Sequence, residues 1–130
     1  MTAAQQPSME GRTARRVMLV DDDEDIRTVL SEALQDAGYD VTCAASGREA
    51  LTQLRGGYRP GLILLDLMMP VMDGWQFRNE QLGQAEIASI PVVVISAVNP
   101  GKQLPEGTTL LRKPFDLDVM LAEVEERLLD

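Results

Sequence analysis

The chain has 130 residues, of which 45% are hydrophobic and 25% charged, so it is long enough for one domain with a sizeable core and too ordinary in composition for general disorder. It has no histidine and a single cysteine, Cys43, which excludes histidine bases and ligands, a cysteine-built zinc site and a disulfide framework. Residues 1–16 carry three arginines against one glutamate, whereas residues 17–130 carry nine basic and twenty acidic side chains.

This charge distribution predicts the domain organisation of the chain and the classes of ligand that it does not bind. We expect a flexible N-terminal tail over residues 1–16 and a single domain over residues 17–130. A domain this acidic repels phosphate groups, so we expect no direct binding to nucleic acid or to an anionic membrane. No segment resembles a membrane span or a secretory signal, which favours a cytoplasmic location.

Short apolar runs of strand length alternate with amphipathic runs at helical spacing from residue 17 onward. In chain order they predict strand 17–20, helix 26–37, strand 40–44, a helix opened by the S-x-x-E sequence 46–49, strand 62–65, helix 73–82, strand 92–95, a brief strand 110–111 and a final helix after Asp116. Cys43 falls in the second strand, which we expect to be buried. This alternation predicts an α/β fold with a doubly wound, five-stranded parallel sheet.

The segment between the fourth and fifth predicted strands is poor in helix-forming residues. Residues 97–107 include Pro100, Gly101, Pro105 and Gly107, and both residue types oppose a regular helix. We therefore expect the fourth helix of the fold to be missing or very short.

Charged and polar side chains follow the predicted strands at their carboxyl ends. Asp21 and Asp22 follow the first strand, Asp66 the third, Ser96 the fourth and Lys113 the fifth. Because the carboxyl ends of parallel strands meet at one edge of a sheet, we expect these side chains to converge. Clustered carboxylates repel one another unless a cation joins them, and Mg²⁺ binds through one or two carboxylates, water and a phosphate. The pattern therefore predicts a magnesium site.

The acidic run continues beyond the first two aspartates, and a helix start explains the remainder. We expect Asp23, Glu24 and Asp25 to cap the first helix and to favour its positive end. The run also imitates a calcium-binding loop, but Ile26 stands where that loop requires glycine. We therefore reject the calcium loop.

The sequence resembles a receiver domain of the two-component response regulators over residues 17–129. The motifs that carry the resemblance are LVDD at 19–22, LLDLMMPVMDG at 64–74, VISA at 94–97 and KPF at 113–115. Each motif is weak alone, but the four occur in order and each ends a predicted strand. The resemblance implies a flavodoxin-like sheet with strand order 2-1-3-4-5.

The resemblance also implies a phosphorylation chemistry. Asp66 would be the phosphoacceptor, Ser96 would donate a hydrogen bond to a phosphoryl oxygen after transfer, and Lys113 would pair with another. An ionised aspartate is itself the nucleophile and needs no base, which fits a chain without histidine. The phosphohistidine donor would belong to a sensor histidine kinase or a phosphotransfer protein. The chain would then be a signalling phosphoacceptor, not an enzyme, that assists only its own phosphorylation and dephosphorylation.

The resemblance assigns the metal ligands position by position. Asp22 would bind Mg²⁺ directly, Asp21 would act mostly through metal-bound water, and Asp66 would share the ion. Met68 would offer its backbone carbonyl, so its apolar side chain is no obstacle.

Two alternatives belong to other functional classes. A pseudo-receiver would keep the fold as an interaction module without phosphorylation, but such modules typically lose the acid pair, the acceptor or the lysine. A phosphohydrolase with an aspartyl nucleophile would need a second acid or base and a substrate lid, and the short loops offer neither. Because the chain ends with its last predicted helix, we expect output through an unidentified partner protein or a phosphorelay.

Overall fold

The computed structural model describes residues 15–67, 72–96, 108–113 and 116–128. Five parallel strands form one sheet in the order β2-β1-β3-β4-β5, which confirms the predicted strand order. The strands are β1 (Arg16–Val20), β2 (Asp40–Ala44), β3 (Leu62–Asp66), β4 (Val92–Ser96) and β5 (Thr108–Arg112). The two strands at the centre of the site described below, β1 and β3, are hydrogen-bonded neighbours.

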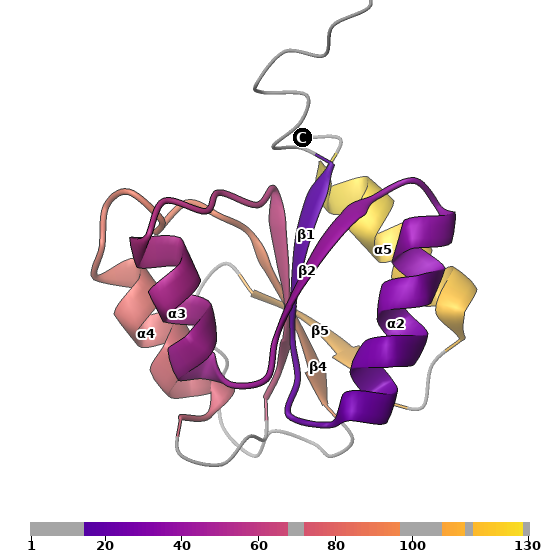
Figure 1. Ribbon diagram of the computed structural model, residues 1–130, viewed down its shortest axis with the longest axis horizontal. Helices are drawn as coiled ribbons and strands as arrows, with labels where there is room; N and C mark the ends of the chain where they lie inside the picture. The colour runs from indigo at the N-terminus through magenta and orange to yellow at the C-terminus, as the bar shows by residue number, and fades with distance from the viewer. Residues whose placement is uncertain (1–14, 68–71, 97–107, 114–115, 129–130) are drawn as a thin grey trace, which may run out of the picture.

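Four helices in the described residues cover the two faces of the sheet. They are α2 (Glu24–Asp36), α3 (Gly47–Arg55), α4 (Gly74–Leu82) and α5 (Leu117–Leu128). Figure 1 shows α2 and α5 on one face and α3 and α4 on the other. The fold is thus a three-layered, doubly wound α/β sheet, and none of the helices described has the length and apolar character needed to cross a membrane.

Local sequence fixes where three of these helices begin. The side chains of Asp23, Ser46 and Asp73 accept hydrogen bonds from backbone N–H groups in the first turns of α2, α3 and α4. Capping side chains of this kind satisfy donors that the helix itself leaves unpaired. At the end of α2, Gly38 adopts a φ of 98°, a conformation that favours glycine.

The core lies in two layers, one on each face of the sheet. Alternate residues of the strands point to opposite faces, so Met18 and Val20 of β1 pack toward α3 and α4 while Val17 and Leu19 pack toward α2 and α5. Strands β3 and β4 are buried along their whole length. This rigid centre holds the carboxyl ends of the strands in place.

Three details differ from the predictions. The fifth strand is a full five residues, because Thr108 and Thr109 extend the apolar pair that marked it. Strand β2 is an edge strand, so Cys43 is half-buried instead of buried. Arg16, which the predicted boundary assigned to the tail, is the first residue of β1 and pairs with β2.

Some predictions concern residues outside the described part of the chain. These are residues 1–14 of the tail predicted over residues 1–16, the carbonyl of Met68, and the missing or very short fourth helix expected within residues 97–107.

Candidate functional site

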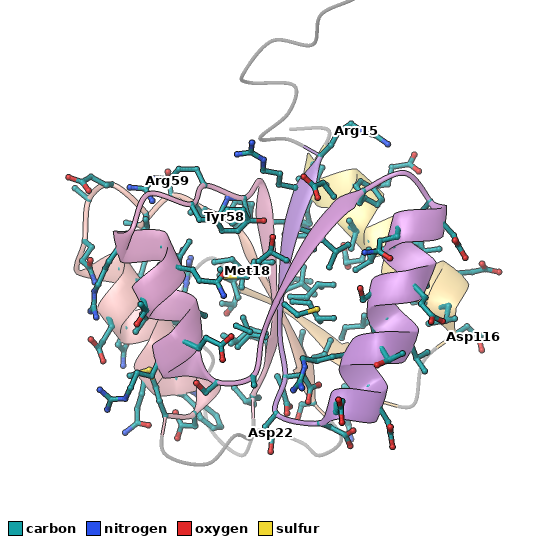
Figure 2. All side chains as sticks on the ribbon, in the orientation of Figure 1. Arg15, Met18, Asp22, Tyr58, Arg59 and Asp116 are labelled. Atoms are coloured by element: carbon teal, nitrogen blue, oxygen red, sulfur yellow. The ribbon has the colours of Figure 1, made fainter. Side chains whose placement is uncertain are left out.

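The carboxyl ends of β1, β3, β4 and β5 bring the predicted polar residues to one edge of the sheet. Asp66 is the last residue of β3 and Ser96 the last residue of β4, whereas Asp21 and Lys113 directly follow β1 and β5. Figure 2 shows Asp22 at this edge, opposite the edge where β1 begins. The arrangement confirms that the sheet topology gathers these side chains.

Three carboxylates form the centre of the site. Asp21, Asp22 and Asp66 each offer an oxygen, and the three oxygens lie within 4.8 Å of one another. Asp21 is fully buried and Asp66 is 6% exposed, whereas Asp22 is exposed to solvent. Three negative charges at this separation repel, so the cluster favours the binding of a cation.

Asp21 has an unusual environment for a carboxylate. Its Oδ1 accepts a hydrogen bond from the backbone N–H of Asp23 at 2.9 Å, but its buried Oδ2 has no hydrogen-bond partner within the described part of the chain. The Nζ of Lys113 lies 3.6 Å from this Oδ2. Burial raises the pKa of Asp21 above its ordinary value, although the Asp23 hydrogen bond and the charge of Lys113 act in the opposite direction.

Lys113 is positioned by the backbone of the neighbouring strand. Its N–H donates to the carbonyl oxygen of Ser96 at 2.7 Å, which ties the ends of β4 and β5 together. The side chain of Lys113 is 21% exposed, and Ser96 is fully buried. A hydroxyl and an ammonium are thus held at the same edge as the carboxylates.

Arg27 also contributes to the site, and sequence reasoning missed it. Its Nη1 donates to the backbone carbonyl of Asp21 at 2.6 Å, which links the first turn of α2 to the loop that carries the acid pair. The only sequence signal for this contact is an arginine one helical turn into α2. The predicted capping role of Asp23 is confirmed, because its side chain accepts from the N–H groups of Asp25 and Ile26.

The donor set fits a divalent cation that prefers oxygen ligands. The buried Oδ2 of Asp21 lacks a hydrogen bond among the described residues, and oxygens of Asp22 and Asp66 lie within reach of the same point. Carboxylate oxygens alone, with one acid open to solvent, suit Mg²⁺, which retains several waters. The site can therefore hold such an ion beside Asp66.

Comparison with known proteins identifies the family. The profile of the response regulator receiver domain matches residues 17–125. The chain belongs to this family. The receiver protein CpdR of Brucella abortus is 34% identical over 119 residues, which cover 88% of this receiver and 98% of CpdR. The transcriptional regulator RpaA of Synechocystis is 35% identical over 114 residues, and the match covers 84% of this chain.

The receiver spans about half the length of several of these relatives. The match covers 47% of RpaA and 51% of Rre1, a second response regulator from Synechocystis. RpaA is a DNA-binding transcriptional regulator.

Solved structures agree with the family and with the fold. The chemotaxis protein CheY4 of Vibrio cholerae superimposes with a TM-score of 0.75 at 32% identity, covering 85% of this receiver and 96% of CheY4. The receiver domain of the hybrid histidine kinase CckA gives a TM-score of 0.74 at 29% identity, covering 87% and 98% of the two chains. The chain is therefore a phosphoacceptor receiver of two-component signalling.

Proposed function

We propose that Asp66 is the phosphoacceptor of this receiver and that Asp21 and Asp22 hold a Mg²⁺ ion beside it. The observation that carries the proposal is the cluster of three carboxylates within 4.8 Å, with the ammonium of Lys113 3.6 Å from Asp21. A structural cap or a solvated acidic loop would not need a buried aspartate that faces two further carboxylates.

The transfer follows from the chemistry of an ionised aspartate. A carboxylate oxygen of Asp66 attacks the phosphorus of a phosphohistidine, the P–N bond breaks as the new P–O bond forms, and the leaving imidazole takes a proton from solvent. Because the chain contains no histidine, the donor is a sensor histidine kinase or a phosphotransfer protein.

Charge neutralisation is the main requirement for this step. When bound, Mg²⁺ supplies positive charge that offsets the carboxylates and the phosphoryl oxygens. Lys113 provides a second positive charge, and Ser96 provides a hydroxyl donor to a phosphoryl oxygen. In this proposal the backbone carbonyl of Met68 completes the metal ligands.

The receiver acts in this proposal as a signalling protein and not as an enzyme with a separate substrate. Phosphorylated Asp66 changes the surface presented at the carboxyl edge of the sheet, and a partner protein or a further phosphotransfer step reads that change. Identification of the kinase and of the output partner requires binding experiments with candidate proteins.

Incubation with acetyl phosphate and Mg²⁺, followed by intact-mass measurement, tests the proposal. We expect the chain to gain one phosphoryl group, and we expect chelation of Mg²⁺ by EDTA to prevent the gain. Asp66→Asn should abolish it, because the amide is not a nucleophile. Asp23→Asn is the matched control, since asparagine still caps α2 and the nearby charge is reduced equally.

Two results would refute the assignment. Equal phosphorylation of the wild type and Asp66→Asn would place the acceptor elsewhere. No phosphorylation of the folded wild type, by acetyl phosphate or by a histidine kinase, would favour an interaction module that works without phosphorylation.

A further inference from the structure

Helices α3 and α4 are joined at the surface by ion pairs. Arg55 of α3 lies 3.0 Å from the carboxylate of Glu80 in α4, and Arg59, just after α3, lies 3.7 Å from Glu86, just after α4. The two arginines come from the last residue of α3 and from the loop that follows it. Each of them is matched by an acid on the α4 side.

The other arginine of α3, Arg48, has no such acid. Arg48 is exposed in the first turn of α3, seven residues before Arg55 and therefore on the same helical face. Within the described part of the chain its guanidinium has neither an ion pair nor a hydrogen bond. The acid of α4 that lines the same groove, Glu80, is already paired with Arg55.

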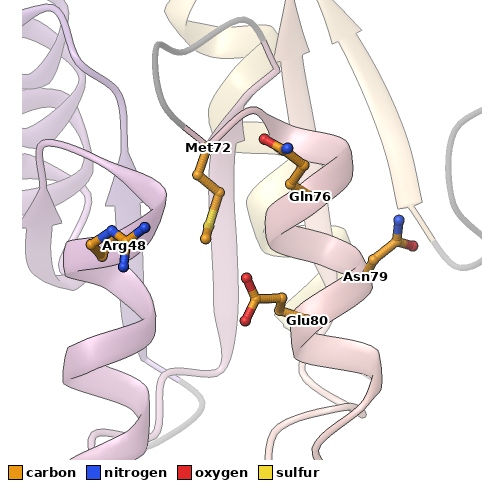
Figure 3. Close-up of a pocket in the computed structure, with 5 residues that line it drawn as sticks. All are labelled: Arg48, Met72, Gln76, Asn79 and Glu80. Carbon is orange, nitrogen blue, oxygen red and sulfur yellow. The ribbon is translucent and has the colours of Figure 1, made fainter.

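An open groove of about 420 Å³ lies at this end of the two helices. Its lining residues are Arg48, Met72, Gln76, Asn79 and Glu80. Figure 3 shows Met72 between the helices, with Arg48 on α3 facing the side of α4 that carries Glu80. None of these residues belongs to the carboxylate cluster.

The electrostatics of the groove favour a single incoming negative charge. Arg48 is the second residue of α3, where the helix dipole disfavours a cation and favours an anion. Glu80 does not neutralise the charge of Arg48, because its carboxylate is paired with Arg55. Gln76 also lines the groove, and its Oε1 accepts from the backbone N–H of Asp73 at the start of α4.

The floor of the groove is apolar. Met72 is 9% exposed and packs against the start of α3, where a Cβ on Gly47 would lie only 3.1 Å from its sulfur. Glycine at this position thus allows the methionine to close the floor. A ligand that fits would combine a carboxylate with an aliphatic group.

We propose that this groove docks a partner protein through one glutamate or aspartate side chain carried beside an aliphatic residue. The carboxylate binds Arg48 and the NH₂ group of Gln76, and the aliphatic group lies against Met72. A polyanion such as nucleic acid does not fit, since the groove offers one unpaired cation opposite Glu80 and the chain has a net charge of −9. The surface is separate from the phosphorylation site, so it can bind a partner before or after phosphorylation.

Two peptides that differ in one group test the proposal on the unphosphorylated protein. The probes are acetyl-Leu-Glu-Leu-amide and acetyl-Leu-Gln-Leu-amide, titrated into the ¹⁵N-labelled chain and followed by amide chemical shifts. We expect the glutamate peptide to shift the amides of Arg48 and Gln76 and to saturate in the millimolar range, about what one charged contact and one apolar contact give. The glutamine peptide should bind at least about tenfold more weakly.

Three variants test whether the charges of Arg48 and Glu80 determine the binding. Arg48→Gln should lose the preference for the glutamate peptide, whereas Arg127→Gln on α5 removes the same charge at a distance and should keep it. Glu80→Gln should tighten binding, because it removes a negative charge from the groove wall. The amide spectrum itself reports whether each variant is folded.

Other outcomes would overturn the proposal. Equal shifts with both peptides, no shifts at the groove, or unchanged binding by Arg48→Gln would show that Arg48 does not select a carboxylate. Shifts at the groove that appear on concentrating the protein without peptide would show that the occupant is a second copy of the chain. None of these results depends on phosphorylation of Asp66.

Discussion

At the scale of single residues, the buried charge of Asp21 destabilises the fold when no cation is bound at the site. The side chain is fully buried, faces two further carboxylates, and has Lys113 as its ion-pair partner among the described residues. Burial of a charge is costly unless partners offset it. A cation that binds the native site and not the unfolded chain therefore stabilises the fold by mass action.

We expect Mg²⁺ to raise the free energy of unfolding by about 2.7 kcal/mol at a hundredfold excess over its dissociation constant. Asp22→Ala should remove most of this gain, because it deletes the exposed carboxylate of the cluster. Thermal melts with and without Mg²⁺ measure the effect. Asp25→Ala, in the first turn of α2 but outside the cluster, is the control. Equal Mg²⁺-induced shifts in the wild type and Asp22→Ala would contradict the metal assignment.

Tyr58 gives a residue-scale prediction at the opposite edge of the sheet (Figure 2). Desolvation raises the pKa of its phenol above the ordinary value of 10.0. A group whose pKa is higher in the folded state contributes stability that is complete below the unfolded pKa and is lost as pH rises through the folded pKa. Unfolding in urea at pH 9 and pH 11 should therefore show a smaller loss of stability for Tyr58→Phe than for the wild type. Tyr39→Phe is the control, and an equal loss in the wild type and Tyr58→Phe would contradict the prediction.

At the scale of elements, α4 carries a buried polar contact that positions the chain between α4 and β4. Gln81 is fully buried, and its Nε2 donates to the carbonyls of Ile87 and Ile90 at 2.8 and 3.0 Å. Its Oε1 accepts from Arg78 Nη1 at 2.8 Å, and the same Nη1 donates to Ile90. One glutamine thus makes three hydrogen bonds within a buried polar cluster.

Gln81→Ala should lower the free energy of unfolding by about 2–4 kcal/mol, because it deletes three buried hydrogen bonds that each contribute about 0.5–1.5 kcal/mol. Urea denaturation measures the change. Gln35→Ala on the exposed face of α2 provides a matched control and should change stability by less than about 0.5 kcal/mol. A loss for Gln81→Ala no larger than that of Gln35→Ala would show that the contact does not order the segment.

The same element shows where sequence reasoning succeeds and where it fails. The start of α4 at Asp73 was predictable, because a capping side chain acts within one turn of its own position. The burial of Arg78 and Gln81 was not, since polar residues at helical spacing normally indicate an exposed face. Val29 shows the opposite case: it follows the apolar period of α2 yet is 52% exposed.

At the scale of the whole molecule, the position of the site was predictable and its contacts were not. Parallel strands place their carboxyl ends at one edge, so Asp21, Asp66 and Lys113 had to converge if the strands were identified correctly. The contact from Arg27 to Asp21 depends on a side-chain conformation that no periodicity specifies. The functional prediction therefore depended mainly on identifying the strands and their order.

Net charge leads to a prediction for the whole chain. With a charge of −9, the chain repels polyanions, so we expect any binding to a labelled DNA duplex at physiological salt to be weaker than a dissociation constant of about 10⁻⁴ M. Fluorescence anisotropy measures it. Tighter binding would contradict the prediction, and repeating the titration without residues 1–14 would show whether the tail causes it.

The direction of the first strand and the last helix has a practical consequence for experiments. Strand β1 begins, and α5 ends, at the edge of the sheet opposite the carboxylates (Figure 1). A five-residue strand spans about 17 Å, so about this distance separates the start of β1 from the acidic edge. Protein immobilised on a biosensor chip through either end therefore presents its carboxylates to the flowing solution. The same chip can then record kinase binding and phosphoryl uptake without a label near Asp66.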